Sequence, residues 1–345
     1  MAKTTTSQNL NDMRSKFPGY YKPTENEFKD LWETAIFVLD ANVLLDLFRY
    51  SDETVKILIN TIIALKERIW IPYRVSLEYH RNLNDVINSQ ISSYNKTIDI
   101  LEEFKKQLDA KRSHPFLKAP LHEEIKSFCS KFDSELTKKK SEVESLIIDN
   151  PIKEKIAELL DDKVGDNLSQ SEIDKICQEG SKRYSEKIPP GYMDNKGKQG
   201  LDAYGDLLIW KEIISKSKSD SKHIILVTGD VKEDWFLKHL GKTISPRPEL
   251  VHEFRMETKK LFYAYPTNQF LEFSNKYFNS NINIAVIEEV EKILATEEKK
   301  AQTSNTSNTT SSQENSTTSQ PNSGEVKAKE ISNSPIDQNQ LKQSI

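Results

Sequence analysis

The sequence is poor in cysteine and has no long apolar run. Its 345 residues include only two cysteines, Cys129 and Cys177, which lie far apart and show no CxxC or metal-ligand spacing. Neither a disulfide framework nor a zinc site is therefore expected, and the pattern favours a reducing compartment. The first residues, MAKTTTSQNLNDMRSKF, lack the apolar segment of a secretion signal, and no run approaches the roughly 18 to 20 apolar residues of a membrane span. We expect a cytoplasmic protein.

A strong excess of positive charge is also missing. The chain has 49 Lys and Arg residues against 53 Asp and Glu residues, for a formal net charge of -4. No global basic field therefore indicates a nucleic-acid partner, although a local basic groove is compatible with this balance. The phosphate-binding pattern GxxxxGK(S/T) is absent from the sequence, which excludes a P-loop enzyme.

The two ends of the chain differ in composition from its middle. From Ala301 onward the sequence is almost pure Ser, Thr, Asn and Gln, which cannot bury enough apolar area to offset its ordering entropy. We predict a disordered tail over residues 299–345. Residues 1–30 are predicted to form an N-terminal arm, whose aromatic side chains can attach it to the body.

Four short apolar runs in the middle of the chain have the texture of buried parallel strands. They read IFVLD (36–40), RIWIP (68–72), HIILVTGD (223–230) and LFYAY (261–265), and helical stretches precede the last three. Alternating strands and helices predict a three-layer α/β/α fold with a mostly parallel central sheet. Ligands of such sheets bind beyond the carboxyl ends of the strands.

A long helical region separates the second of these runs from the third. Its apolar residues, among them Leu101, Phe104, Phe128 and Phe132, recur at spacings near three and four, which predicts an antiparallel helical hairpin. We therefore expect a helical insertion over residues 81–187, completed by further helices around 152–163 and 170–186. The sheet domain would then be discontinuous, with residues 31–80 and 188–298.

Acidic residues fall at matching places around the predicted sheet. Asp40 ends the first apolar run, Glu78 follows the second, Asp206 begins a helix and Asp230 ends the third run; Asp202 and Asp234 lie close to two of them. Because like charges repel at short range unless a cation or protons neutralise them, such a set indicates a divalent metal site. One or two Mg²⁺ ions would suit in-line displacement at a phosphodiester. Asn42 and Thr228 would supply neutral polar groups beside the acids.

The ordered motifs around these acids resemble those of a known family. DANVLLDLFR, IPxxVxxEYHRN, PPGYMDNKGKQGLDAYGDLLIWKEII and ILVTGDVKEDWF are similar to the four motifs of PIN-domain nucleases, specifically the large bacterial PIN-like proteins with a helical insertion. The resemblance implies a Mg²⁺- or Mn²⁺-dependent endoribonuclease, often in a toxin or phage-defence setting. It also implies metal-binding roles for Asp40, Glu78, Asp206 and Asp230 and accessory roles for Asn42 and Thr228, with Asp202 and Asp234 as further candidate ligands.

Simpler roles exist for single residues of this set. Asp40 or Asp206 alone could cap a helix, and Asp234 could cap a helix or pair with a neighbouring lysine. Asp46 need be no more than a surface residue. The remaining candidates are Arg49, Arg81 and Lys232, which could hold substrate phosphates or lie on a solvated face, and His80, which could bind metal or hydrogen-bond locally.

Two other functions compete with the nuclease. A haloacid-dehalogenase-type phosphatase requires an acid two residues after its nucleophilic aspartate, and here that position is Asn42, which cannot transfer the proton. A catalytically silent PIN-like module that binds nucleic acid or protein would keep the fold without cleavage. The expected partner is nucleic acid, with RNA favoured over DNA, and the insertion is interpreted as a substrate-selecting lid, a dimerisation arm or a site for a regulatory partner.

Overall fold

The computed structural model describes residues 12–110, 117–193, 198–278 and 280–310. The described residues up to Glu298 form one compact unit, and residues 299–310 belong to a second. The strands are β1 Ile36–Leu39, β2 Ile69–Trp70, β3 Ile224–Thr228, β4 Phe236–His239, β5 Lys242–Pro246 and β6 Phe262–Pro266. The helices are α1 Met13–Lys16, α2 Glu25–Thr34, α3 Ala41–Leu45, α4 Asp52–Ala64, α5 Tyr73–Leu108, α6 Ala119–Ser145, α7 Pro151–Leu159, α8 Gln170–Ser185, α9 Gly205–Asp220, α10 Pro248–Thr258, α11 Thr267–Phe278 and α12 Ile284–Thr310.

The central sheet has the strand order β2-β1-β3-β6, and every pair in it is parallel. Leu39 at the end of β1 pairs with Val227 of β3, and Thr228 at the end of β3 pairs with Pro266 of β6. This register brings the residues that follow β1 and β3 to the same edge of the sheet. All four predicted strands are present, and the predicted parallel sheet is confirmed.

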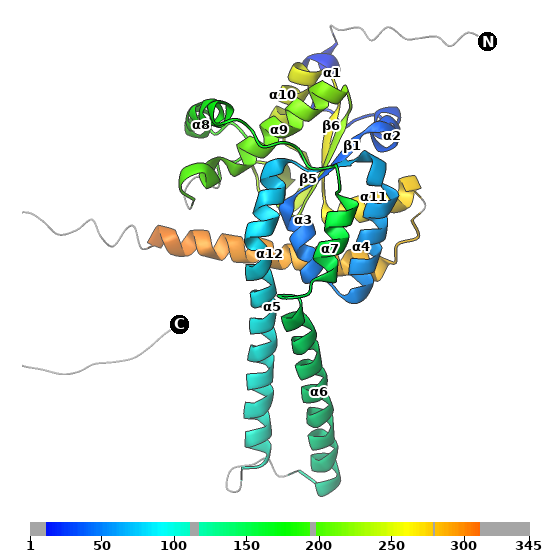
Figure 1. Cartoon of the computed structure of the whole chain (residues 1–345), viewed down its shortest axis with the longest axis vertical. Helices are drawn as coiled ribbons and strands as arrows, with labels where there is room; N and C mark the ends of the chain where they lie inside the picture. The colour runs from blue at the N-terminus through cyan, green and yellow to red at the C-terminus, as the bar shows by residue number, and fades with distance from the viewer. Residues whose placement is uncertain (1–11, 111–116, 194–197, 279, 311–345) are drawn as a thin grey trace, which may run out of the picture. The chain divides into compact units, whose positions relative to one another are not determined.

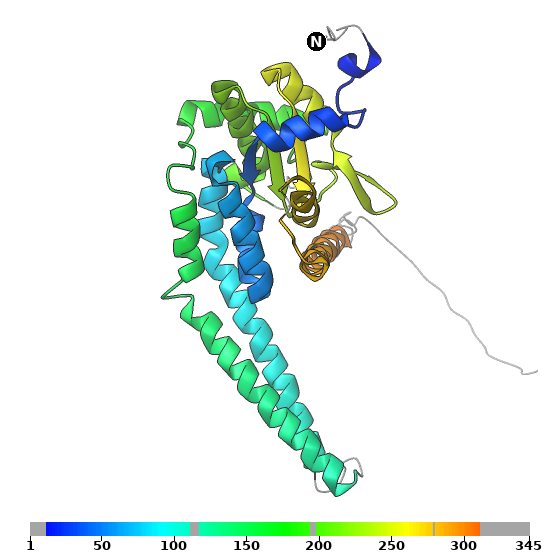
Figure 2. The ribbon, with the colours of Figure 1, turned by 90° about the vertical axis from the view of Figure 1, so that its right-hand side faces the viewer.

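Helices cover both faces of this sheet, as Figures 1 and 2 show. On one face α2 and α11 pack through aromatic contacts, with ring centroids 5.1 Å apart for Phe28 and Tyr263 and 6.0 Å apart for Phe37 and Phe270. On the other face α9 and α10 pack against Phe262, whose ring centroid is 5.0 Å from that of Trp210 and 5.3 Å from that of Phe254. These contacts confirm the three-layer α/β/α architecture.

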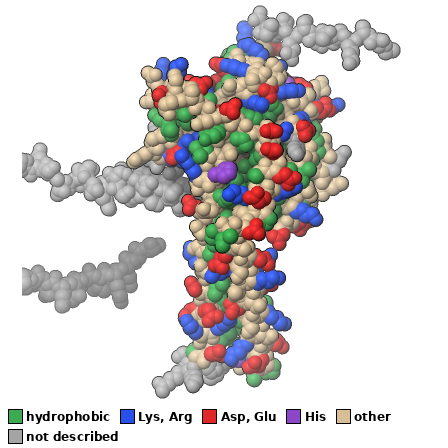
Figure 3. Space-filling view, viewed as in Figure 1, with side chains coloured by type: hydrophobic (Ala, Val, Ile, Leu, Met, Phe, Trp, Pro, Cys, Tyr) green, Lys and Arg blue, Asp and Glu red, His purple; other side chains and the backbone are tan. Residues whose placement is uncertain are grey.

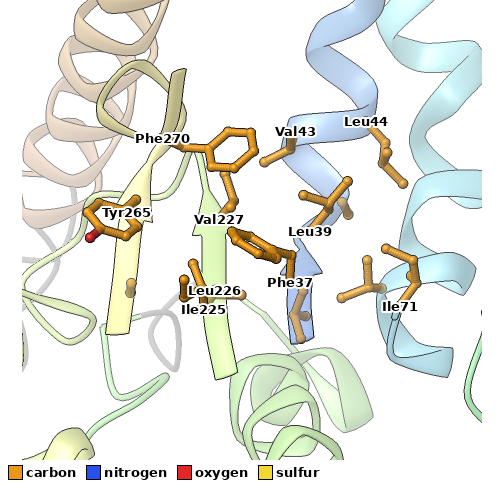
Figure 4. Packing of buried hydrophobic residues seen from close by; sticks show 14 of the residues in the cluster. Phe37, Leu39, Val43, Leu44, Ile71, Ile225, Leu226, Val227, Tyr265 and Phe270 are labelled. Carbon is orange, nitrogen blue, oxygen red and sulfur yellow. The ribbon is translucent and has the colours of Figure 1, made fainter. Parts of the chain in front are cut away.

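The core continues to the carboxyl edge of the sheet. Figure 4 shows Val43 of α3 and Phe270 of α11 close to Leu39 and Val227, the residues that end or nearly end β1 and β3. All four side chains are fully buried. The polar residues that follow these strands are therefore carried on a tightly packed apolar base, which limits their movement.

The helical hairpin of α5 and α6 is confirmed, and both views of the ribbon show the two helices side by side. Leu101, Leu108 and Cys129 are buried along it. Phe104, Phe128 and Phe132, expected in the same seam, are instead 45%, 66% and 39% exposed. Two helices bury only one narrow seam between them, so the outer part of a wide apolar stripe stays in solvent. Blue and red side chains alternate along the hairpin in Figure 3.

The insertion and the sheet are joined more closely than the predicted boundaries imply. Helix α5 begins at Tyr73, so Glu78 already lies on the first helix of the insertion. Ile156 and Leu159 of α7 belong to the same hydrophobic cluster as the strands, and Ile71 forms an isolated parallel bridge with Val164. The insertion therefore shares its core with the sheet rather than forming a core of its own.

Two further features differ from the sequence prediction. The antiparallel pair β4–β5 follows Trp235, where a helix was considered for the segment around Asp234. Helix α12 continues through Thr310 into the range predicted as tail, because extending a formed helix adds one hydrogen bond for each residue fixed. The N-terminal segment from residue 1 to 11 and the tail from 311 to 345 lie outside the described residues. None of the helices in the described ranges is long and apolar enough to cross a membrane.

Helix α5 receives its N-terminal cap from another helix. Its own N-cap residue, Pro72, offers no side-chain hydrogen bond. The buried carboxylate of Glu212 on α9 accepts the backbone N–H of Tyr73 at 2.7 Å and also that of Arg74. Burial raises the pKa of Glu212 to about 7, against these hydrogen bonds and the Arg74 charge, which lower it.

This pKa predicts that the stability of the protein depends on pH. The folded chain holds the Glu212 proton more tightly than the unfolded chain, so stability from this group is lost as the pH rises from 4.5 to about 7. Glu212→Gln removes the titration. Between about pH 5 and pH 8, its free energy of unfolding should rise relative to wild type by about 1 to 3 kcal/mol. Urea unfolding at several pH values measures this difference, and a difference that stays constant would contradict the assignment.

Candidate active site

Asp40 lies at the centre of a hydrogen-bond network beyond the ends of β1 and β3. Its Oδ1 accepts the N–H of Ala41 at 2.7 Å, which makes Asp40 the N-cap of α3. Its Oδ2 accepts hydrogen bonds from Asn42 Nδ2 and from Thr228 Oγ1, each at 2.7 Å. The helix-cap role and the site role therefore belong to the same carboxylate, and two strands hold it in place.

The turn after β3 is bound to the turn after β1 by the same polar side chains. The N–H of Gly229 donates to Asn42 Oδ1 at 2.6 Å, and the N–H of Asp230 donates to Thr228 Oγ1 at 2.9 Å. Thr228 is 2% exposed, so its hydroxyl forms these hydrogen bonds away from bulk water. The predicted accessory residues Asn42 and Thr228 thus connect Asp40 to Asp230.

Asp230 lies beside a lysine ammonium. Lys232 Nζ is 2.7 Å from Asp230 Oδ2, and the Lys232 N–H donates to Asp230 Oδ1 at 3.1 Å. Both side chains are partly buried. Lys232, predicted as a phosphate-binding residue, therefore lies at the acidic cluster and neutralises part of its charge.

Glu78 joins this cluster from α5. Burial, followed by the nearby Asp40 charge, raises the pKa of Glu78, whereas Lys198, Arg74 and Lys232 lower it. Burial also raises the pKa of Asp40, and the Asp230 charge adds to this increase against three hydrogen bonds that lower it. Asp40 is therefore an electrostatic neighbour of both Glu78 and Asp230.

Asp206 approaches from the first turn of α9. Its Oδ2 accepts a hydrogen bond from Trp235 Nε1 at 3.3 Å. Gly191 packs against it, and a Cβ added there would lie 3.2 Å from the Cβ of Asp206. Gly191 also has a φ of +92°, a conformation that favours glycine. Trp235 is buried, and its hydrogen bond orients Asp206.

Asp234 is fully buried and faces the loop that follows α8. Its Oδ2 accepts the N–H groups of Gly191 at 2.9 Å and Met193 at 3.2 Å. Its Oδ1 finds no hydrogen-bond partner within the described ranges. Burial raises the pKa of Asp234, and the Asp230 charge also acts in this direction. Asp234 thus fastens the loop that packs against Asp206.

Asp202 forms ion pairs with two arginines. Arg74 Nη2 donates to Asp202 Oδ1, and Arg81 Nη1 lies 3.5 Å from the same oxygen. The Asp202 side chain is 59% exposed. Arg81, predicted to bind phosphate, and Asp202, predicted as a further ligand, are therefore joined in an exposed ion pair.

Asp46 and Arg49, for which expectations also came from the sequence, form a pair directly after α3. Asp46 is 3% exposed, so its expected place on the surface is wrong. Arg49 Nη1 lies 2.6 Å from Asp46 Oδ1 and lowers its pKa, which burial raises. Because a buried charge is costly without a partner, Arg49, predicted as a phosphate-binding residue, also serves as the charge partner of Asp46. His80 is exposed, and its Nδ1 lies 2.7 Å from the carbonyl oxygen of Ser76.

The acidic side chains of the site have the chemistry that a divalent cation requires of its ligands. Asp40, Glu78 and Asp230 offer hard carboxylate oxygens of the kind that Mg²⁺ and Mn²⁺ prefer. Burial raises the pKa values of Asp40 and Glu78, and a neighbouring acid adds to the increase at each, a contribution that a cation would relieve. Within the described part of the chain, no three His, Cys, Asp or Glu side chains are gathered closely enough to hold an ion. The residues therefore fit in chemistry, and side-chain shifts would be needed to gather them around an ion.

Lys198 is recognisable in the sequence as one of the basic residues that flank the acidic motifs, but the contacts of its loop with individual acids were not predicted. Lys198 acts on Glu78 from the loop before α9, and Gly191 packs on Asp206 from the same loop. The Gly and Lys residues of this loop were visible as a turn in the sequence. Their contact with the acids depends on the return of the chain from the insertion, which no local pattern predicts.

One comparison with known proteins identifies the family of the chain. A family model described as a PIN-like domain matches residues 36–250, from the start of β1 to the beginning of α10. The match includes Asp40, Glu78, Asp206 and Asp230. No curated protein and no solved structure matched the chain. Because the family match covers more than half of the sequence and contains both strand ends that carry the acidic cluster, the chain belongs to the PIN-like domain family.

Proposed function

We propose that the protein is a metal-dependent endonuclease that hydrolyses phosphodiester bonds of single-stranded RNA. The observation that carries the proposal is the pair of hydrogen bonds by which Thr228 joins Asp40 to Asp230 at the carboxyl edge of the sheet, with Glu78 near enough to Asp40 for that charge to raise its pKa, after burial. PIN-like domains are generally nucleases, and RNA rather than DNA is taken from the resemblance of the motifs. A role in a toxin or phage-defence system is part of the same proposal.

Asp40, Glu78, Asp206 and Asp230 would hold one or two Mg²⁺ or Mn²⁺ ions. A bound ion would supply charge neutralisation at the scissile phosphate and a more acidic water. The protein's own groups have distinct tasks. Asn42 and Thr228 hold the Asp40 carboxylate by two hydrogen bonds, and Trp235 orients Asp206. Lys232 and Lys198 would move from the acids toward the phosphates of the substrate, as flexible ammonium groups can.

A catalytically silent PIN-like module is the second candidate. It is favoured by the Lys232–Asp230 ion pair at 2.7 Å, because an ammonium there neutralises the acid without a metal. Such a protein would bind nucleic acid or another protein through the same edge. The helical insertion would then select the partner or join two copies, which stays a prediction from the sequence.

Cleavage assays separate the two candidates. Asp40→Asn and Asp230→Asn should each reduce cleavage of labelled single-stranded RNA by about 100-fold or more, because they remove charge that stabilises a bound cation. The matched control is Asp220→Asn, at the exposed end of α9, which should cleave as wild type does. Parallel reactions use Mg²⁺, Mn²⁺ or EDTA, and single-stranded DNA and duplexes as substrates. Full activity of Asp40→Asn, or products ending in a 2′,3′-cyclic phosphate instead of a 5′-phosphate and a 3′-hydroxyl, would contradict the proposal.

A pair of threonines tests how the Asp40 carboxylate is held. Thr228→Val leaves Asp40 Oδ2 with one bond fewer and the Asp230 N–H without its acceptor, so we expect a loss of about 1 to 3 kcal/mol in stability and about tenfold in cleavage. Thr267, which follows β6, is equally buried, but its Oγ1 has no partner among the residues that the structure describes.

Thr267→Val is therefore the matched control, since it removes a buried hydroxyl without breaking a hydrogen bond. Its stability and activity should equal or exceed those of wild type. Thermal unfolding and the RNA cleavage rate are measured on both variants. Equal effects of the two substitutions would show that the Thr228 hydrogen bonds do not hold the site.

A further inference from the structure

Two of the four acids depend on helix packing for their relative position. Asp40 and Asp230 follow strands β1 and β3, which are hydrogen-bonded to each other. Glu78 lies on α5 and Asp206 on α9, and helices α6, α7 and α8 separate these two helices along the chain. Some contact between α5 and α9 must therefore set how far Glu78 lies from Asp206.

Glu212 provides one such contact. It lies on α9 with a side chain that is largely buried, and its carboxylate accepts the N–H of Tyr73 at 2.7 Å together with that of Arg74. The first N–H groups of a helix have no partner within the helix, and Pro72 supplies none at this one. The start of α5 is thus fixed by a side chain of α9.

Arg74 provides a second contact at the other side of Asp206. Its guanidinium donates to Asp202, in the 3-10 turn Gly200–Tyr204 that leads into α9. The first turn of α5 is therefore bound to the α9 segment before and after Asp206. Arg74 and Glu78 are four residues apart on one helix, so they lie on the same face of α5, one turn from each other.

The buried carboxylate has a cost that a packed apolar side chain at the same position would avoid. Burial raises the pKa of Glu212, which shows that its charged form is disfavoured there. A leucine would fill the space without this penalty, but it could not accept the N–H groups of α5. What a carboxylate does here that an apolar residue could not do is therefore to accept hydrogen bonds from the first turn of α5.

We propose that Glu212 is a positioning residue of the acidic site: from α9 it fixes the first turn of α5 and so sets the position of Glu78 relative to Asp206. The proposal rests on the proposed nuclease function and deepens it. Glu212 is not one of the acids that the sequence motifs assign to the metal. Glu212 touches neither substrate nor metal. Its effect on the site passes through the backbone of Tyr73 and Arg74.

The test measures backbone protection and metal binding in the full chain. Glu212→Ala should increase amide hydrogen exchange in the segment from Tyr73 to Glu78 and weaken Mn²⁺ binding, measured with Mn²⁺ alone by electron paramagnetic resonance, by about 10-fold or more. Glu212→Gln keeps one acceptor oxygen and should recover most of both properties. Glu212→Asp keeps the charge but shortens the reach, so it should behave like Glu212→Ala and replaces it if that variant does not fold.

Thr24→Ala is the matched control for the loss of a helix cap. Thr24 caps α2 through an exposed capping box with Glu27 that contains none of the four acids, and its removal should lower thermal stability without changing exchange at the start of α5 or Mn²⁺ binding. Equal exchange of the Tyr73–Glu78 segment in Glu212→Ala and Thr24→Ala would overturn the proposal. So would faster exchange in Glu212→Ala with Mn²⁺ affinity unchanged.

The outcome for Glu212 can be separated from that of the nuclease proposal. If the wild-type chain neither binds Mn²⁺ nor cleaves RNA, the proposed function fails, and the exchange data alone decide whether Glu212 holds α5. If wild type does both and Glu212→Ala keeps kcat while raising only KM for RNA, the residue acts on substrate binding and the positioning role is wrong.

Discussion

The site depends on the hydrogen bond from Thr228 Oγ1 to Asp40 Oδ2, at 2.7 Å, which joins the end of β3 to the end of β1. It is possible only because the parallel register of the two strands brings their carboxyl ends together. The same hydroxyl accepts the N–H of Asp230, so one side chain orders two acids. The apolar layer beneath, with Leu39 and Val227 fully buried, prevents this edge from adjusting freely.

Burial of several carboxylates close to one another is the main electrostatic feature of this edge. Burial and the neighbouring acids raise the pKa values of Asp40 and Glu78. Lys232 and Lys198 offset part of the negative charge, Lys232 by a direct ion pair with Asp230. An ammonium and a divalent cation satisfy the same need, and a substrate phosphate would favour the exchange of one for the other by attracting the lysines. The position of Lys232 is thus compatible with catalysis and with a silent site.

Much of the fold was accessible from the sequence because buried parallel strands leave short apolar runs that end in polar residues. Those runs gave β1, β2, β3 and β6, and with them the common edge for Asp40 and Asp230. The pair β4–β5 was missed, since its strands are short and half exposed and lack a continuous apolar pattern. The seam of the hairpin was drawn too wide because periodicity identifies an apolar stripe without saying how much of it a single partner helix covers.

The parts of the site that escaped prediction all depend on contacts between distant segments. Asp234 has the sequence of a possible ligand, yet its oxygen receives the N–H groups of a loop that precedes it by a long stretch of chain. Glu212 has the sequence of an ordinary helical glutamate, and only the approach of α5 makes it a cap. Local patterns identify which residues can do chemistry, and the packing of helices decides which of them meet.

A crystal structure of the full chain soaked with Mn²⁺ is the most direct test of the central claim that the acids at the strand ends form a metal site. Anomalous scattering locates manganese without reference to any assumed ligand. The account predicts a peak bound by Asp40 and Asp230, with Glu78 or Asp206 turned toward it and Lys232 displaced from Asp230. No peak at this edge, with Lys232 still paired to Asp230, would contradict it and favour the silent binding module.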